Sequence, residues 1–255
     1  MKRISLIVLL TISVCYLFAC VFLFFIQRSL LYFPTFESNL SDSASVTLRT
    51  GGETLRIWTR LTDSPDAVIY FGGNSEDVAS NFRAFSKLLP NQNLYFVNYR
   101  GYGGSTGSPS EAALFSDALA VYDWVHEKSP NISVVGRSLG SGVAVYLASV
   151  RKVDRLVLVT PYDSIENVAK KSFPIFPISL LLRDKFNSAS RVQSITAKTL
   201  IILAENDEVI PLENSDALIA EFPSDQVTIK VIYETSHNTI GFSPAYFELI
   251  GSFYE

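Results

Sequence analysis

The sequence predicts an α/β fold, in which a mostly parallel β-sheet carries helices on both faces and follows one N-terminal transmembrane helix. Short apolar segments alternate along the chain with longer segments of helical character. The apolar segments are nearly continuous runs, which is typical of parallel strands that are buried on both faces. The chain has 255 residues, which suits one domain of ordinary size with an appendage.

The N-terminal segment predicts the membrane helix, because residues 4–26 contain neither a charge nor a proline. About 20 apolar residues suffice to span a bilayer. A cleavable signal has a shorter apolar core and a small-residue cleavage site, and no such site follows here. We therefore expect an uncleaved anchor over residues 1–27 and a juxtamembrane segment over residues 28–44. Tyr32 and Phe33 either lie at the lipid interface or pack on the following domain.

The distribution of basic residues predicts the orientation of this anchor. Lys2 and Arg3 precede the apolar run, whereas Arg28 follows it alone. The positive-inside rule then leaves the N-terminus in the cytoplasm and places the domain on the periplasmic or another extracytoplasmic side. Cys15 and Cys20 both lie in the anchor, so the predicted domain has no thiol for a disulfide or a thiolate metal site.

The remaining residues, 45–255, predict a single domain. It begins with a hairpin of strands 45–50 and 54–60, joined through Gly51 and Gly52. Further strands are expected at residues 67–71, 93–99, 132–135, 155–160, 199–204 and 227–233, and helices up to residue 89 and at residues 110–128, 139–150 and 244–253. Residues 162–192 interrupt this alternation with two prolines and a Leu-Leu-Leu run. They form either a small lid over a site or a helical connection with its own packing.

Charge and motifs exclude several function classes. The net charge of −4 comes without a basic patch, which argues against a nucleic-acid partner. The glycines of RGYGGSTG, residues 100–107, miss the dinucleotide-binding spacing, and Pro109 precedes the helix that would hold the pyrophosphate. Phosphate-binding loops and metal-binding His or Cys clusters are absent from the sequence. We therefore predict no nucleotide, no metal and no cofactor.

A serine between two glycines is the main candidate for chemistry. In NISVVGRSLGSGVAVYLASV, residues 131–150, Gly136, Ser138 and Gly140 fit the pattern G-x-S-x-G. The pattern is common by itself, but here a strand precedes it and a helix of small residues follows. So tight a turn strains the central residue, and flanking glycines remove the side chains that would clash. We predict that Ser138 is a nucleophile and not only a helix N-cap.

A nucleophilic serine needs a positioned base, and the sequence contains only two histidines. His126 comes late on a predicted helix, where a surface histidine is the ordinary explanation. His237 follows the last predicted strand in a loop, and loops at the carboxyl ends of parallel strands are where such folds place active sites. We therefore predict His237 as the general base.

The base in turn needs a carboxylate that fixes its tautomer. Asp207 follows the strand at residues 199–204 directly and lies between Ser138 and His237 in the chain, which is the order expected for this architecture. Glu205 and Glu208 are neighbouring alternatives. We predict Asp207 as the third member of a catalytic triad.

An acyl transfer also needs N–H donors for the developing oxyanion. One is expected to be the backbone N–H of Leu139, directly after the nucleophile. The second is expected from the loop FGGNS, residues 71–75, where the backbone N–H of Asn74 is our first choice and that of Gly73 the second. The alternative for this loop is a strand-to-helix turn that is capped by Asn74 or Ser75.

Taken together, these motifs resemble the α/β-hydrolases, and in particular a membrane-anchored subgroup of small α/β-hydrolase-domain proteins that includes protein depalmitoylases and bacterial inner-membrane homologues. The resemblance covers nearly the whole chain, through LLYFPT (30–35), IYFGGNSE (69–76), NYRGYGGSTGSPSE (98–111), GRSLGSG (136–142), AENDEVIP (204–211) and SHNTI (236–240). It implies a serine hydrolase with Ser138, Asp207 and His237 as its triad and the N–H groups of Leu139 and Asn74 as oxyanion donors. The family usually has His-Gly-Asn in the oxyanion loop, whereas Gly72 takes the place of the histidine here, which puts the rigidity of the loop or the rate in question.

The resulting hypothesis is a membrane-tethered serine hydrolase that cleaves carboxylic esters or thioesters without a cofactor. Tethering favours substrates presented at a bilayer, such as lipids, acylated proteins or amphiphilic small molecules. Two alternatives stay open. The same triad serves serine peptidases and acyltransferases, and a non-catalytic membrane scaffold can keep a hydrolase fold.

Overall fold

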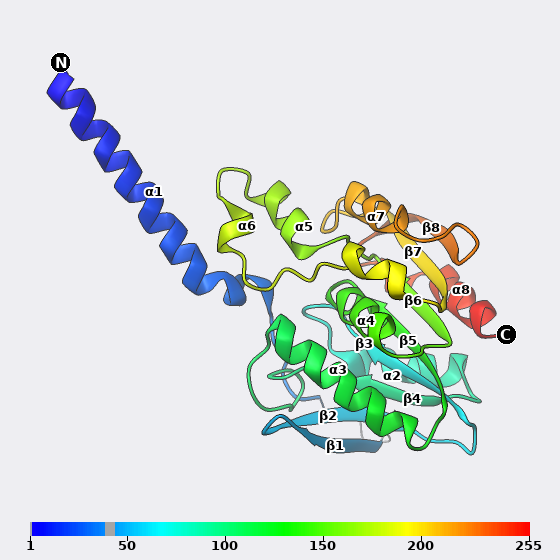
Figure 1. Ribbon diagram of the computed structural model, residues 1–255. Coiled ribbons are helices and arrows are strands. Elements are labelled where there is room, and N and C mark those ends of the chain that lie inside the picture. Colours follow the sequence, from blue (N-terminus) through cyan, green and yellow to red (C-terminus); the bar gives the residue numbers. More distant parts are fainter. Residues whose placement is uncertain (1, 39–43) are drawn as a thin grey trace.

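The computed structural model describes residues 2–38 and 44–255 and contains one central eight-stranded sheet. The strands lie in the order β1-β2-β4-β3-β5-β6-β7-β8 (Figure 1). The strands are β1 (Ala44–Thr50), β2 (Glu53–Arg60), β3 (Asp66–Phe71), β4 (Asn93–Val97), β5 (Asn131–Arg137), β6 (Arg155–Val159), β7 (Lys198–Asn206) and β8 (Val227–Ser236). The β1–β2 and β2–β4 pairs are antiparallel, and all others are parallel. The predicted α/β architecture is thereby confirmed.

Helices connect the strands and cover both faces. They are α1 (Lys2–Leu31), α2 (Val78–Leu88), α3 (Glu111–His126), α4 (Leu139–Val150), α5 (Ile165–Ser172), α6 (Ile178–Leu181), α7 (Leu212–Ile219) and α8 (Pro244–Tyr254), with short 3-10 helices η1 (Ala189–Ser194) and η2 (Ile240–Phe242). Ser110 caps α3 as predicted, since its side chain accepts a hydrogen bond from the N–H of Ala113. Helix α7, which directly follows Pro211, was not among the predicted helices.

Two apolar cores hold the helices on the sheet. One core packs α3, α4 and α7 on one face, and the other packs α2 and α8 on the opposite face. The middle strands contribute to both, so that all of β4 is buried. This burial on both faces explains the uninterrupted apolar runs in the sequence.

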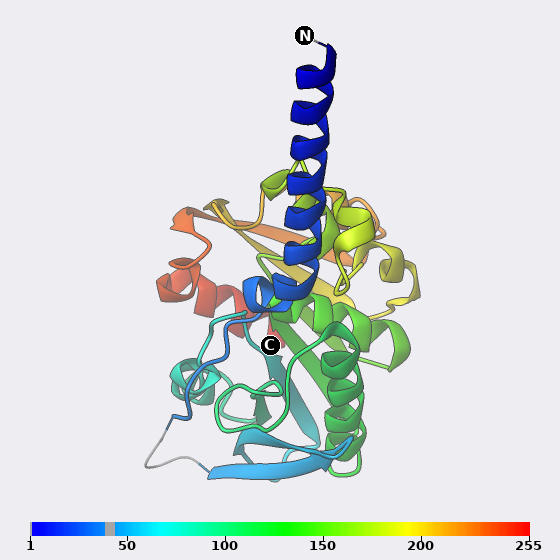
Figure 2. The same cartoon turned by 90° about the vertical axis from the view of Figure 1, so that its left-hand side faces the viewer.

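Helix α1 projects from the domain, with the N-terminus at its far end (Figures 1 and 2). Residues Ile4–Leu31 are long and apolar enough to cross a membrane. The helix continues past residue 27, where we expected the anchor to end, so residues 28–31 of the expected juxtamembrane segment are helical. Tyr32 is 4% exposed and packs on the domain, whereas Phe33 is 51% exposed. Residues 39–43 of that segment lie outside the described residues.

Residues 162–192 contain α5, α6 and the start of η1, and they stand beside the base of α1 (Figure 1). Gln27 donates a hydrogen bond to the carbonyl of Leu181, and Arg28 forms an ion pair with Asp184 at 2.8 Å. The hydroxyl of Tyr32 donates to the same aspartate at 3.2 Å. The insertion therefore docks on α1, in addition to its connection with the sheet.

Candidate active site

Ser138 lies at a strained corner between β5 and α4. Its backbone has φ 50° and ψ −118°, a conformation that L-residues rarely adopt. Glycines are needed before and after Ser138, because neighbouring backbone atoms leave no room for a Cβ at either position. A Cβ at Gly136 would lie 2.4 Å from the carbonyl oxygen of Gly140, and one at Gly140 would lie 2.1 Å from that of Phe71. The small residues therefore let helix and strand approach closely enough to present Ser138.

The structure brings the three predicted triad side chains into one line. The Nε2 atom of His237 lies 2.8 Å from the Oγ of Ser138. On the other side of the ring, Nδ1 lies 2.8 Å from Oδ2 and 3.0 Å from Oδ1 of Asp207. These residues come from the loops that follow β5, β7 and β8. The geometry is that of a hydroxyl, a base and an orienting carboxylate.

Backbone hydrogen bonds hold the carboxylate and the histidine in place. The Oδ1 atom of Asp207 accepts the N–H groups of Val209 at 3.0 Å and Ile210 at 2.7 Å. The backbone N–H of His237 donates to Glu208 at 3.1 Å. The side chains of His237 and Asp207 are 7% and 3% exposed, so little water competes for the bond between them. The aspartate is oriented by the turn itself and needs no further side-chain partner.

The alternative candidates lie elsewhere. The carboxylate of Glu205 accepts the backbone N–H of Glu234 at 2.9 Å, and Glu208 contacts the backbone of His237 and not its ring. His126 is exposed at the end of α3, where its ring stacks on that of Tyr122. Neither glutamate nor His126 shares a hydrogen bond with Ser138.

The loop after β3 lies against Ser138, since a Cβ built on Gly73 would be 3.6 Å from the Cβ of Ser138. The N–H of Gly73 is engaged, because it donates to Glu76 at 2.7 Å. Among the described hydrogen bonds, the N–H groups of Asn74 and Leu139 have no acceptor. The Asn74 side chain is fixed, since its Oδ1 accepts from the N–H of Phe33 and the hydroxyl of Tyr102. Leu139 directly follows Ser138, and Asn74 lies in the loop beside it, so their role as oxyanion donors stays a prediction.

Glu76 braces this loop, although it was not among the predicted site residues. One of its oxygens accepts from Gly73 and from Arg137 at 3.2 Å, and the other accepts from the Tyr70 hydroxyl at 2.6 Å and from Asn81 at 2.7 Å. Arg137 also donates to the backbone carbonyl of His237 at 3.3 Å, so one buried ion pair links the loop after β3 to the loop that carries His237. The only signal in the sequence is an acid just after the glycines and an arginine just before the serine.

Burial and charge shift the pKa of two members of this network, Tyr70 and Arg137. Burial, and then the negative charge of Glu76, raises the pKa of Tyr70 well above its usual value, so the phenol stays a donor. Burial by itself lowers the pKa of Arg137, but Glu76, Tyr70 and Tyr246 together outweigh this effect, so the pKa of the guanidinium is raised. The guanidinium of Arg137 therefore stays charged in the neutral pH range.

An open cleft of about 470 Å³ lies beside Ser138. Its walls come from the loop after β3, the start of α2, the loop that carries His237, and Phe33. None of its lining residues belongs to the insertion at 162–192. A lid role for the insertion therefore stays a prediction, and the walls described here leave the cleft open.

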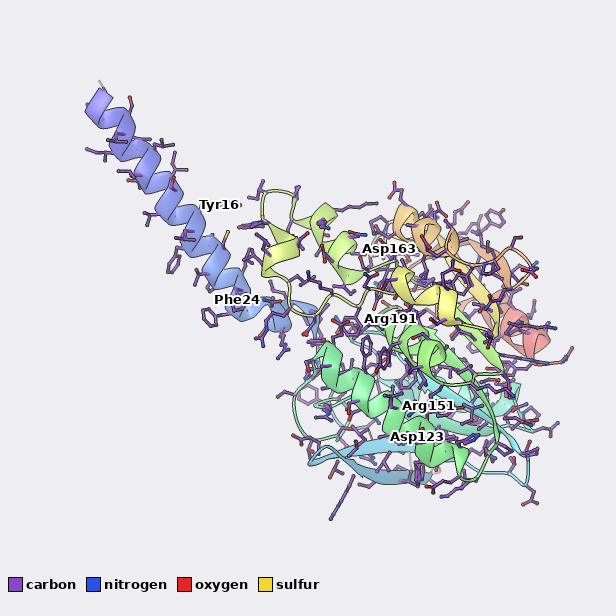
Figure 3. All side chains as sticks on the ribbon, in the orientation of Figure 1. Tyr16, Phe24, Asp123, Arg151, Asp163 and Arg191 are labelled. Atoms are coloured by element: carbon purple, nitrogen blue, oxygen red, sulfur yellow. The ribbon has the colours of Figure 1, made fainter. Side chains whose placement is uncertain are left out.

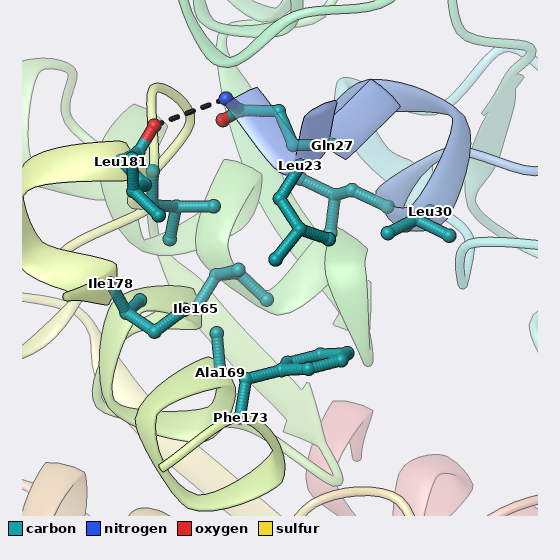
Figure 4. A pocket seen from close by; sticks show the side chains of 10 residues that line it. Leu23, Gln27, Leu30, Ile165, Ala169, Phe173, Ile178 and Leu181 are labelled. Carbon is teal, nitrogen blue, oxygen red and sulfur yellow. Dashed lines mark hydrogen bonds between the residues drawn. The ribbon is translucent and has the colours of Figure 1, made fainter. Parts of the chain in front are cut away.

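The insertion instead lines a second cavity, together with α1. This cavity has a volume of about 120 Å³, and Gln27 is its one polar side chain (Figure 4). Leu23, Leu30 and Leu31 of α1 face Ile165, Ala169, Phe173, Ile178, Leu181 and Leu182 of the insertion. Leu31 of this cavity and Phe33 of the cleft are two positions apart, so about 7 Å at most separates their Cα atoms.

Comparisons with known proteins agree with this architecture. The alpha/beta hydrolase fold family matches residues 66–177. A protein of Mycobacterium tuberculosis is 34% identical over 218 residues, which cover 76% of this chain and 74% of that protein. Lysophosphatidylserine lipase ABHD12 of Xenopus tropicalis is 30% identical over 217 residues, covering 73% of this chain and 55% of the lipase. The crystal structure of the Pyrococcus furiosus esterase Pf2001 has a TM-score of 0.70 at 19% identity, and covers 87% of this chain and 97% of the esterase.

The sheet, the strained serine corner and the histidine and aspartate loops define an α/β-hydrolase architecture. The chain belongs to the α/β-hydrolase fold family, and a lysophosphatidylserine lipase is among its relatives. The expected resemblance is therefore confirmed. The catalytic roles of individual residues stay predictions.

Proposed function

We propose that this protein is a membrane-tethered serine hydrolase that cleaves carboxylic esters or thioesters through an acyl-enzyme. The observation that carries the proposal is the line from Ser138 Oγ through the imidazole of His237 to Asp207, with 2.8 Å at each junction. The relatives support the same chemistry, since one is named a lipase and a structural neighbour is an esterase.

In the proposed reaction, the Oγ of Ser138 attacks the acyl carbonyl while Nε2 of His237 takes its proton. The carbonyl oxygen becomes an oxyanion and is held by the N–H groups of Leu139 and Asn74. Asp207 stabilises the imidazolium. The imidazolium then protonates the leaving oxygen or sulfur as its bond to the acyl carbon breaks, and an alcohol or a thiol departs. A water molecule, deprotonated by the same histidine, cleaves the acyl-enzyme and restores the serine hydroxyl.

The membrane helix and the apolar cavity favour amphiphilic substrates, in particular lipids and acylated proteins. The cleft at Ser138 is mixed in character, and its wall at Phe33 adjoins the apolar cavity between α1 and the insertion. An ester near the cleft can therefore place a hydrocarbon chain on the α1 side. The excess of basic residues before the apolar run of α1 favours a cytoplasmic N-terminus and an extracytoplasmic domain.

A fluorophosphonate probe tests the proposal, because it reacts only with an activated serine. We expect labelling of the full-length protein in detergent, and loss of labelling and of ester turnover in Ser138→Ala. Ser141→Ala is the matched control, since Ser141 lies one turn along α4 and, within the described part of the chain, its hydroxyl donates only to the carbonyl of Ser138. Equal labelling of parent and Ser138→Ala would refute the assignment.

Substrate profiling separates the remaining classes of function. Faster turnover of acyl esters and thioesters than of aminoacyl-amides supports the hydrolase proposal. Preferential amide cleavage indicates a peptidase, and acyl transfer to an added alcohol in preference to water indicates an acyltransferase. Absence of turnover over the whole series indicates a scaffold.

A further inference from the structure

The tip of the insertion, residues 173–182, carries an apolar surface that the mechanism does not use. Its sequence FPIFPISLLL contains no charge. Phe173, Ile175 and Leu180 are 42%, 71% and 83% exposed. Exposed apolar side chains that lie together mark an interaction surface more often than chance exposure does.

The tip reaches far along the membrane helix. The hydroxyl of Tyr16, which lies half-way along α1, donates to the carbonyl of Ile175 at 2.8 Å, and its ring stacks on that of Phe176 with centroids 6.0 Å apart. Figure 3 shows Tyr16 on the side of α1 that faces the loop between α5 and α6. At ~1.5 Å per residue, Tyr16 lies about 18 Å along the helix from Arg28. A hydrocarbon core is ~30 Å thick, so this contact falls near its middle when α1 spans it.

Charged residues that follow the apolar part of α1 and the tip of the insertion lie side by side. Arg28 is the first charged residue after the apolar run of α1, and it pairs with Asp184, which follows the tip. Next to this pair, the N–H of Arg183 donates to the side chain of Gln27 at 2.7 Å. Both apolar segments therefore end at one polar boundary, as they would at a membrane surface.

The backbone of the tip is largely satisfied within the protein, which a lipid environment demands. Pro174 and Pro177 have no N–H to satisfy. Most other N–H groups of the tip donate to nearby carbonyl oxygens. The donating residues are Phe173, Phe176, Ile178, Leu180, Leu181 and Leu182. The carbonyls of Ile175 and Leu181 accept from Tyr16 and Gln27 of α1. A short irregular segment can therefore enter hydrocarbon at modest cost, because its neighbour helix supplies the missing donors.

We propose that the tip of the insertion is embedded in the hydrocarbon of the bilayer beside α1, so that the domain holds the membrane at two points. Lipid acyl chains cover the apolar surface of the tip. The cavity between α1 and the insertion then opens toward one leaflet of the membrane. This inference rests on the proposed membrane anchoring through α1, and not on the catalytic role of Ser138.

Nitroxide depth measurements in phosphatidylcholine vesicles test the inference on the full-length protein. Cys15 and Cys20 are replaced by serine, and a single cysteine is introduced and spin-labelled in each of four variants: Ile175→Cys, Leu180→Cys, Val14→Cys and Phe242→Cys. Val14 on α1 reports the membrane, and Phe242 is the matched aqueous control, since it is a large apolar residue that is 84% exposed on η2. Collision rates with oxygen and with a water-soluble nickel chelate are compared at each position.

We expect the ratio of oxygen to nickel collisions at positions 175 and 180 to match that at position 14 and to exceed that at position 242 several-fold. Two labelled positions guard against local disturbance of one variant. A water-like ratio at both tip positions with a lipid-like ratio at position 14 overturns the inference and leaves the anchoring intact. A water-like ratio at position 14 as well overturns both.

Discussion

Replacing Glu76 with alanine separates the rate of the proposed reaction from the stability of the fold. Glu76 holds the oxyanion loop through the N–H of Gly73 and balances the charge of Arg137. Its other oxygen accepts from Tyr70 and Asn81. Alanine removes both acceptors at once, so one substitution frees the loop and leaves a buried cation without a partner.

The kcat of Glu76→Ala is expected to fall because Glu76 fixes the N–H of Gly73, and the next peptide along the chain carries the N–H of Asn74. Losing one oxyanion donor typically lowers kcat by ~10²–10³. The donor acts on charge that develops only in the transition state, so KM is expected to change little. We therefore predict that Glu76→Ala lowers kcat by up to about 10²–10³ at nearly constant KM.

The stability is expected to fall for a different reason. The side chains of Glu76 and Arg137 are 7% and 14% exposed, and removing one partner of such a buried pair costs about 3–5 kcal/mol. Adding Arg137→Met to Glu76→Ala removes the unpaired cation as well. The double variant is therefore expected to regain much of the unfolding free energy without regaining kcat.

Steady-state kinetics with a chromogenic ester and chemical denaturation of each variant provide the two readouts. Glu248→Gln, a substitution at an exposed glutamate on α8, is the matched control for the change in charge. An unaltered kcat in folded Glu76→Ala refutes the bracing argument. So does a double variant in which rate and stability recover together.

Two further substitutions test the carboxylate and the serine corner. Asp207→Asn retains a side chain of the same shape but no longer fixes the tautomer of His237, so kcat in an ester assay is expected to fall by about 10⁴ while the thermal midpoint stays near that of the parent. A decrease below tenfold would contradict a triad role. Gly140→Ala places a Cβ 2.1 Å from the backbone oxygen of Phe71, and such overpacking is expected to lower the unfolding free energy by about 1–3 kcal/mol. Gly241→Ala is its control, because a Cβ there meets nothing within 4 Å, and equal midpoints for the two variants would show that the close approach carries no strain.

The sheet could be predicted because its strands are buried on both faces and therefore leave a strong trace in the sequence. The placement of the site follows from the same sheet. The loops with Ser138, Asp207 and His237 follow parallel strands β5, β7 and β8, whose carboxyl ends meet at one edge. The distances between the side chains could not be predicted, since they depend on the register between strands far apart in the chain.

The docking of the insertion on α1 could not be predicted from residues 162–192. Its helices are short, and their apolar residues face a partner more than a hundred positions earlier in the chain, as in the bond from Tyr16 to Ile175. The burial of Tyr32 has the same origin, because its hydroxyl meets Asp184 of the insertion. Local patterns report the periodicity of an element and not the distant surface that completes it.

Gly72 shows how a departure from the family pattern is accommodated. The resemblance placed a histidine there and left the rigidity of the oxyanion loop in question. In this chain a Cβ at position 72 would lie 2.6 Å from the side chain of Val78, so the start of α2 occupies the space of a larger residue. The carboxylate of Glu76 fixes the next peptide through Gly73, and Arg137 ties it to the backbone of His237. The side chain of Glu76 thus holds the loop after β3 from the α2 side. Its ion pair with Arg137 couples the proposed oxyanion donors to the proposed base.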